Sequence, residues 1–286
     1  MKSFDGKVAA ITGAGSGMGR TLALSLARRG CDVAISDVDE RGLAETVSLA
    51  AKHPVKVTSK RVDVSKREQV YAWADDVVRD HGRCHLIFNN AGVSHTSTIE
   101  GLEYADFEWI MGINFWGVVY GTKAFLPHLK AAGEGHIINT SSLFGLLAIP
   151  SQSTYNATKF AVRGFTEALR EELELTRSPV SATCVHPGGI KTNIARSGRI
   201  DPSMKDLGVV DVEKSRRNFE KAFRVTAEDA AETILRGVQR NSRRVLIGTD
   251  AIFLDLLQRV APGSYHAVVA AAARRTMKRM GGGPST

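Results

Sequence analysis

The chain has 286 residues, of which 43% are hydrophobic and 24% charged, as in globular proteins with a substantial core. The formal net charge of +8 lies wholly in the last hundred residues, because residues 1–186 carry 20 basic and 20 acidic side chains and residues 187–286 carry 18 and 10. The sequence has no apolar run long enough for a membrane-spanning helix. Its N-terminus does not have the order of regions typical of a signal peptide, which favours a cytoplasmic protein. Cys31, Cys84 and Cys184 show no metal-ligand spacing and are expected to be packing residues.

Short apolar runs rich in β-branched residues alternate along the chain with longer segments of helical period. Such alternation predicts an α/β domain, a parallel sheet built from βαβ units with helices on both faces. The predicted strands are residues 7–12, 32–37, 55–63, 85–89, 136–141, 180–186 and 244–248. The predicted helices are residues 18–30, 40–52, 66–81, 103–130, 152–175 and 227–240.

Two segments interrupt this alternation. Residues 188–226 are polar, charged and poorly periodic, and a connection of that length in a compact domain is usually functional or disordered. Residues 250–279 contain two further helical stretches after the last predicted strand. Packing on the body of the protein explains these stretches most simply; a partner subunit or a membrane surface is the alternative.

A glycine-rich loop follows the first predicted strand, in the sequence TGAGSGMG of residues 12–19. Glycines at this place let backbone N–H groups approach a pyrophosphate at the start of a helix. The G-x-G-x-x-G fingerprint does not fit this loop. The P-loop pattern does not fit either, which argues against a nucleoside triphosphatase. The spacing that fits is Thr12-Gly13-x-x-x-Gly17-x-Gly19.

Asp37 ends the second predicted strand, 24 residues after Gly13. A carboxylate there accepts hydrogen bonds from an adenosine ribose and repels a 2′-phosphate, and Val38 follows it in place of a basic residue. These features favour NAD over NADP. Arg41 is the reservation, because its guanidinium could reach a 2′-phosphate.

Tyr155 and Lys159 lie one turn apart on a predicted helix, in the sequence YNATK. Together with the glycine loop and NNAG at residues 89–92, this pair makes the chain resemble the short-chain dehydrogenases/reductases, over roughly residues 5–250. The loop spacing matches the compact TGxxxGxG subgroup, and Ser16 departs from the extended one. The resemblance implies a single Rossmann-type doubly wound domain over residues 1–250 and leaves residues 251–286 as a C-terminal helical extension with a frayed end.

The resemblance implies a catalytic set of Asn114, Ser142, Tyr155 and Lys159. Ser142 is selected over Ser141 because the family serine lies thirteen residues before the tyrosine, so Ser141 is expected to be structural. Asn114 matches an asparagine that kinks a helix and holds a water linked to the lysine.

The resemblance also implies a binding site for the nicotinamide cofactor. Asn89 is expected to border the adenosine together with Ala91 and Gly92, and His186, outside the family pattern, is expected to be structural. The predicted cofactor-binding residues are Gly13, Ser16, Gly17, Met18, Gly19, Asp37, Asp63, Val64, Asn90, Ala91, Gly92, Tyr155, Lys159, Pro187, Gly188, Ile190 and Thr192.

The chemistry of such a site explains the pairing of a phenol with an ammonium. Reduction of a carbonyl needs a proton at oxygen and oxidation of an alcohol needs a base, whereas a free phenol has a pKa of about 10. Bringing that pKa near 7 takes about 4 kcal/mol, which one cation about 4 Å away supplies at an effective dielectric of 20 but not in water. We therefore expect Lys159 to lower the pKa of Tyr155 in a sheltered site, and Ser142 to hold the substrate oxygen.

The predicted function is hydride transfer between NAD(P) and a secondary alcohol or ketone. Residues 188–226 are expected to form a lid, and Leu143, Phe144, Leu146 and Ile149 an apolar wall that suits a lipophilic substrate. A cofactor-binding regulator and a nucleic-acid or membrane-surface binder that uses the basic final third are the alternatives. The resemblance implies a homodimer or homotetramer, and no metal, nucleic acid or integral membrane segment is expected.

Overall fold

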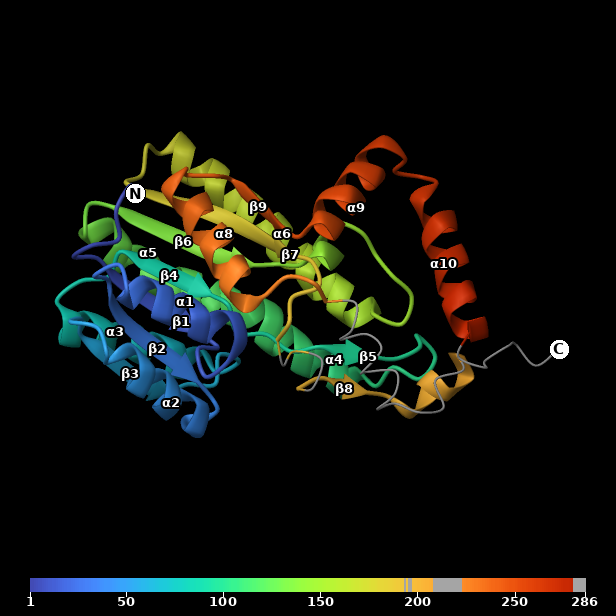
Figure 1. The fold of residues 1–286 in the computed structure, drawn as a ribbon, viewed down its shortest axis with the longest axis horizontal. Helices are drawn as coiled ribbons and strands as arrows, with labels where there is room; N and C mark the ends of the chain where they lie inside the picture. The colour runs from blue at the N-terminus through green and yellow to red at the C-terminus, as the bar shows by residue number, and fades with distance from the viewer. Residues whose placement is uncertain (193, 195–196, 208–222, 280–286) are drawn as a thin grey trace.

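A seven-stranded parallel sheet forms the centre of the computed structural model (Figure 1). The structure describes residues 1–192, 194, 197–207 and 223–279. The strand order β3-β2-β1-β4-β6-β7-β9 reverses direction between β1 and β4, which is where doubly wound sheets bind ligands. The strands are β1 (Val8–Thr12), β2 (Asp32–Asp37), β3 (Val57–Arg61), β4 (Leu86–Asn89), β6 (Gly135–Thr140), β7 (Val180–Pro187) and β9 (Arg244–Ile247). Every predicted strand is confirmed.

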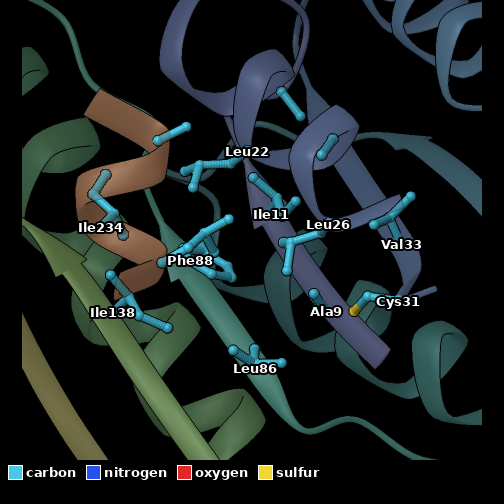
Figure 2. Packing of buried hydrophobic residues seen from close by; sticks show 14 of the residues in the cluster. Ala9, Ile11, Leu22, Leu26, Cys31, Val33, Leu86, Phe88, Ile138 and Ile234 are labelled. Carbon is cyan, nitrogen blue, oxygen red and sulfur yellow. The ribbon is translucent and has the colours of Figure 1, made fainter. Parts of the chain in front are cut away.

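Helices cover both faces of the sheet, as the sequence predicts. Figure 2 shows one face, where Leu22, Leu26 and Ile234 from two helices pack against Ile11 and Phe88 of the strands. On the other face Trp73 and Phe125 make an edge-to-face contact, with ring centroids 5.2 Å apart. The first face is covered by α1 (Gly17–Ala27), α2 (Glu40–Ala50) and α8 (Ala227–Gln239), the second by α3 (Arg67–His81), α5 (Gly117–Ala131) and α6 (Ser153–Leu175).

The single helix predicted at residues 103–130 is in fact three segments. A π-helical turn, η1 (Gly112–Trp116), separates α4 (Tyr104–Met111) from α5. Asn114 lies in this turn, and its side chain hydrogen-bonds to both backbone groups of Val93. This long-range contact places the asparagine against the end of β4, and the wider turn accommodates it.

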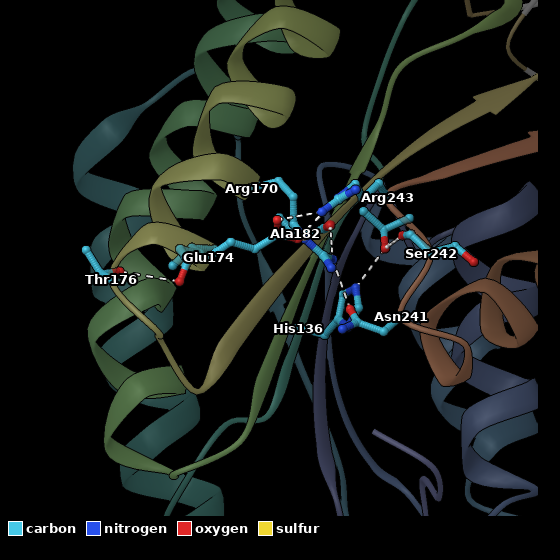
Figure 3. Close-up of polar contacts among 10 residues, drawn as sticks. His136, Arg170, Glu174, Thr176, Ala182, Asn241, Ser242 and Arg243 are labelled. Carbon is cyan, nitrogen blue, oxygen red and sulfur yellow. Dashed lines mark hydrogen bonds and ion pairs between the residues drawn. The ribbon is translucent and has the colours of Figure 1, made fainter.

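A network of polar side chains fastens the amino-terminal edge of the sheet (Figure 3). The Arg170 guanidinium of α6 donates to the carbonyl of Ala182 in β7 and to Asn241 before β9, and it pairs with Glu174. His136 at the start of β6 shares a hydrogen bond of 2.7 Å with Thr183. These contacts lie at the edge opposite the glycine loop, so they stabilise the sheet without taking part in the candidate site.

The irregular segment after β7 contains regular structure that the sequence does not predict. β8 (Arg199–Ile200) pairs with β5 (His95–Thr96), and η4 (Pro202–Leu207) follows it. Ile190 also forms an isolated bridge with Val225, close to the far end of the segment. Of the predicted lid at residues 188–226, residues 193, 195, 196 and 208–222 lie outside the described residues.

The two helices after β9 are present as predicted. α9 (Thr249–Val260) and α10 (Tyr265–Arg279) meet the body through a third apolar cluster, in which Leu143, Leu147, Ala251 and Tyr265 are buried. The short helical turn η2 (Leu143–Gly145) contributes the body's side of this cluster. None of the helices described, α9 and α10 included, is long and apolar enough to cross a membrane.

Tyr265 joins α10 to the body, because its side chain is buried in the third cluster and its hydroxyl accepts a hydrogen bond of 3.4 Å from the Ala148 N–H. Replacing Tyr265 with Ala removes most of this contact, at a local cost of about 3 kcal/mol. Hydrogen exchange of amides in residues 249–271 should then accelerate roughly 100-fold while amides of β1 and β4 keep their rates. Tyr265→Phe is the control and should retain slow exchange; equal rates in all three proteins would show that α10 is held otherwise.

Candidate active site

The glycine loop is packed so closely against the end of β4 that larger residues do not fit. Gly13 has a φ of +68°, and a Cβ on it would lie 2.7 Å from the Cα of Ala91. A Cβ on Gly19 would lie 2.1 Å from the Gly13 carbonyl oxygen. Ser16 begins α1 without a side-chain hydrogen bond to the helix, so the first N–H groups of α1 remain for another acceptor. This arrangement fits a pyrophosphate group.

Thr12 and Asn90 hold the loop and the NNAG segment together. The Thr12 hydroxyl accepts hydrogen bonds of 3.0 Å from the N–H groups of Asn90 and Ala91, and the Asn90 amide donates to the Thr12 carbonyl at 3.0 Å. The Asn90 Oδ1 atom is buried without a partner among the described residues. Asn90 and Ala91 therefore lie at the predicted cofactor site.

Asn89 occupies a different place from the one expected. It is 2% exposed, and its amide donates to Asn139 of β6 and to Thr122 of α5. The side chain thus points into the interior between the sheet and α5, and the expectation that Asn89 borders the adenosine is wrong. The alternation of side chains along a strand explains the error, because neighbouring asparagines face opposite ways.

Asp37 lies next to the glycine loop at the end of β2. Its carboxylate accepts hydrogen bonds from the Gly15 N–H at 2.8 Å and the Asp39 N–H at 3.0 Å, and it is half-buried. Because a carboxylate has more than two acceptor positions, ribose hydroxyl groups can still bind to it. Arg20 is committed to the Gly15 carbonyl and to Glu45, whereas the exposed Arg41 guanidinium lines the same hollow.

Tyr155, Lys159 and Ser142 meet at the carboxyl ends of β6 and β7. Tyr155 is 8% exposed and Lys159 3% exposed, and the Lys159 Nζ lies 5.6 Å from the centre of the phenol ring. That ammonium donates a hydrogen bond of 3.0 Å to the Thr140 carbonyl. The Ser142 hydroxyl accepts a hydrogen bond of 3.1 Å from the Phe144 N–H and lies close enough to the Tyr155 phenol to lower its pKa.

Gly92 brings the end of the NNAG segment to this group. A Cβ on Gly92 would lie 3.3 Å from Asn114 Oδ1 and 3.5 Å from Lys159 Nζ. The Asn114 amide is occupied by Val93 and by the Thr158 hydroxyl at 3.3 Å. The structure thus brings together all four residues of the predicted catalytic set, and the water-holding role of Asn114 stays a prediction.

Burial changes the proton affinities of the central pair. Desolvation raises the pKa of Tyr155 above its usual value, against a smaller lowering by the Ser142 hydrogen bond, and it lowers the pKa of Lys159 to about 8. Desolvation of the phenol therefore dominates its pKa in this structure, and the lowering by Lys159 stays a prediction for the site with cofactor and substrate bound. Neutral phenol is the resident form, which suits a proton donor.

The Ser142 turn is held from two sides by residues that the sequence analysis regards as structural. The Ser141 hydroxyl donates to the Lys159 carbonyl at 2.7 Å. His186 is fully buried at the end of β7, and its Nδ1 lies 3.0 Å from the Ser142 carbonyl oxygen. Burial lowers the pKa of His186 to about 4, so the ring is neutral near pH 7 and donates from Nδ1. The sequence motifs do not predict this contact between His186 and Ser142.

The apolar wall differs from the predicted one. Leu143 is 6% and Leu146 1% exposed, and Leu143 belongs to the cluster shared with α9 and α10. Phe144 and Ile149 are partly exposed, and the Phe144 ring makes an edge-to-face contact with Tyr155, with centroids 6.2 Å apart. Two of the four predicted wall residues are thus core residues.

The other predicted cofactor residues lie around the same edge of the sheet. Thr192 is close to the start of α1, since a Cβ on Gly17 would lie 3.2 Å from its side chain. Asp63 and Val64 follow β3, where the Asp63 carboxylate accepts hydrogen bonds from Ser65. The remaining residues are at the start of α1 or at and after the end of β7, and they are Ser16, Met18, Pro187, Gly188 and Ile190.

Replacing Lys159 with Met should stabilise the unliganded protein at pH 7. Because the pKa of Lys159 falls from 10.5 to about 8 on folding, the folded protein carries a buried charge below pH 8, and its stability rises with pH between about 8 and 10.5. Less the lost hydrogen bond, the gain is about 2 kcal/mol at pH 7 and shrinks toward pH 10. Urea unfolding at both pH values measures it; a variant that is less stable at pH 7 would contradict the desolvation argument.

Known proteins resemble this chain over nearly its whole length. Residues 7–202 match the family model described as short chain dehydrogenase. "Putative oxidoreductase SadH" of Mycobacterium tuberculosis is 50% identical over 95% of this chain and 96% of its own. Human estradiol 17-beta-dehydrogenase 11 is 29% identical over 94% of this chain and 83% of its own.

Solved structures show the same fold. A short-chain dehydrogenase/reductase from Burkholderia phymatum in complex with NAD has a TM-score of 0.82 and 32% identity, over 91% of this chain and 95% of its own. The fold, the glycine loop and the extent of the family match agree. The chain belongs to the short-chain dehydrogenase/reductase family of oxidoreductases, which bind a nicotinamide cofactor.

Proposed function

We propose that this oxidoreductase transfers hydride between NAD and a secondary alcohol or ketone, with Tyr155 as general acid and base. The observation that carries the proposal is the buried group of Tyr155, Lys159 and Ser142 beside the glycine loop. All four predicted catalytic side chains are present in one place, which disfavours a regulator without turnover. Cytoplasmic location and assembly into a homodimer or homotetramer remain predictions.

The contacts of Ser142, Tyr155 and Lys159 indicate a separate role for each in this reaction. The bound nicotinamide supplies the hydride chemistry. Ser142 donates to the substrate oxygen and fixes it beside the phenol, and Tyr155 delivers the proton to that oxygen during reduction. In the oxidative direction the phenol must give up its own proton first; bound ligands that exclude water strengthen the attraction of the Lys159 ammonium for the phenolate.

The cofactor would be held along the carboxyl edge of the sheet. Gly13 and Gly19 leave room for the pyrophosphate, and Asp37 would accept hydrogen bonds from the adenosine ribose. The support for NAD over NADP is the negative charge of Asp37 together with the engagement of Arg20 by Glu45. Arg41 is the one cation of this hollow, within the described residues, that keeps an exposed guanidinium free to meet a 2′-phosphate.

The substrate class rests on the surroundings of Tyr155. Phe144 contacts its ring, and Ile149, five residues further along the chain, is partly exposed, which favours an apolar substrate. One relative bears the name of a dehydrogenase of estradiol, a lipophilic secondary alcohol. We propose that residues 188–226 cover this substrate as a lid.

Tyr155→Phe should reduce kcat for a secondary alcohol with NAD about 1000-fold, because the phenol proton is the one transferred. Affinity for NADH, followed by nicotinamide fluorescence, should stay within about threefold of wild type, since the ring remains in place. Tyr71→Phe makes the same change on the exposed side of α3 and should leave both quantities unchanged. Full turnover by Tyr155→Phe would refute the assigned mechanism.

NADH should bind about tenfold more tightly than NADPH, and Asp37→Asn should remove most of that difference. Asparagine keeps an acceptor for the Gly15 N–H and loses the charge, so the variant separates repulsion of the phosphate from support of the loop. Arg41→Ala should leave NADH binding unchanged. If Asp37→Asn keeps the preference for NADH, Asp37 has only a structural role. If the wild type prefers NADPH, Arg41 rather than Asp37 determines the choice of cofactor.

A further inference from the structure

The outer side of α9 is an exposed apolar stripe. Ile252, Leu256 and Val260 recur every fourth residue and are 55%, 58% and 76% exposed, and Phe253 beside them is 64% exposed. Residues at this spacing lie on one side of a helix. Among the described residues nine large hydrophobic side chains are more than half exposed, and five of them belong to α9 and α10. Clusters of this kind mark contact surfaces.

The opposite side of α9 packs on the body of the protein, and the carboxylate that it carries is paired. Ala251 is fully buried, and Leu254 and Leu257 pack on the third apolar cluster. Asp255 is 8% exposed, and its carboxylate pairs with Arg244 and Arg259 at 2.9 Å. Asp255 is therefore neutralised on the inner side, and the other acidic residue of α9, Asp250 in its first turn, accepts a hydrogen bond of 2.8 Å from the Gly189 N–H and lines one hollow with Arg224 and Phe253.

The chain around the stripe is basic. From Leu256 to Thr286 the sequence contains no Asp or Glu and five basic residues, which are Arg259, Arg274, Arg275, Lys278 and Arg279. Arg274 and Arg275 are exposed on α10, the helix that follows α9 in Figure 1. Exposed apolar side chains, here on α9, and exposed basic ones, here on the following helix α10, are together the combination that binds the interface of an anionic lipid layer.

A second copy of the chain fits this surface less well. Two identical surfaces placed face to face would bring the basic residues of both copies together, and neither copy supplies an acidic side chain after Asp255. Like charges brought together in an interface oppose association. An anionic lipid surface has the opposite charge and accepts the apolar stripe.

We propose that the outer face of α9, with the basic α10, docks this enzyme on anionic lipid surfaces. The stripe enters the headgroup region, and Arg274 and Arg275 face the lipid phosphates. The inner side of the same helix packs on the η2 turn, which carries Leu143 and Phe144 beside Tyr155. The docked surface and the candidate active site thus adjoin through one helix.

Co-sedimentation of the full chain with vesicles tests this proposal. The protein should bind vesicles of phosphatidylcholine and phosphatidylglycerol, bind about tenfold less well to phosphatidylcholine alone, and dissociate as salt is raised. Phe253→Ser with Leu256→Ser should weaken binding about tenfold, and Arg274→Glu with Arg275→Glu by a similar factor. Leu175→Ser, which changes a still more exposed apolar side chain at the end of α6, is the control and should bind as wild type does.

Native NADH affinity in every variant shows that the protein is folded, and this readout is independent of turnover. Binding that survives both double substitutions overturns the proposal, as does absence of binding by the wild type. Loss of a dimer in Phe253→Ser with Leu256→Ser, without any vesicle binding by wild type, would assign the stripe to a second copy instead. Failure of the catalytic proposal would show in Tyr155→Phe and leave these results untouched.

Discussion

The buried ammonium of Lys159 is the constraint around which the candidate site is arranged. A charge that is 3% exposed and hydrogen-bonded to one backbone carbonyl, that of Thr140, reduces the stability of the unliganded protein, and its lowered pKa expresses that cost. The cost is tolerable because the rest of the fold is well packed, with apolar clusters on both faces of the sheet. Under the proposed function Lys159 would gain partners when cofactor and substrate bind, which would offset this cost.

The site is precise because polar side chains from one element fasten the backbone of another. Thr12 and Asn90 join β1 to the end of β4, Asn114 joins η1 to Val93, and His186 joins β7 to Ser142. Each contact fixes a residue at the carboxyl edge of the parallel sheet, the edge where such sheets bind ligands. These contacts join different elements at the carboxyl edge, while the amino-terminal edge is fastened separately by Arg170.

The sequence predicts the strands and helices well, because a parallel sheet buried on both faces makes each strand an apolar run and each helix a periodic segment. Motif spacing likewise brings Ser142, Tyr155 and Lys159 together. Long-range contacts escape this reasoning: the π turn at Asn114 depends on Val93, and the β5–β8 pair has two residues per strand. The direction of the Asn89 side chain and the raised pKa of Tyr155 depend on burial, which periodicity does not report for single residues.

The C-terminal extension packs beside the candidate active site. The family model ends at residue 202, yet the match with the mycobacterial relative covers 95% of the chain and therefore includes α9. The inner side of α9 completes the apolar cluster next to the turn after Ser142, so a shift of α9 would also shift that turn. A lipophilic substrate is concentrated in a lipid layer rather than in water, because transfer of apolar surface into that layer is favourable. The proposed docking of α9 would bring the enzyme to the place where a lipophilic substrate is most abundant, so the apolar outer face of α9 and the apolar residues of η2 beside Tyr155 would serve the same substrate.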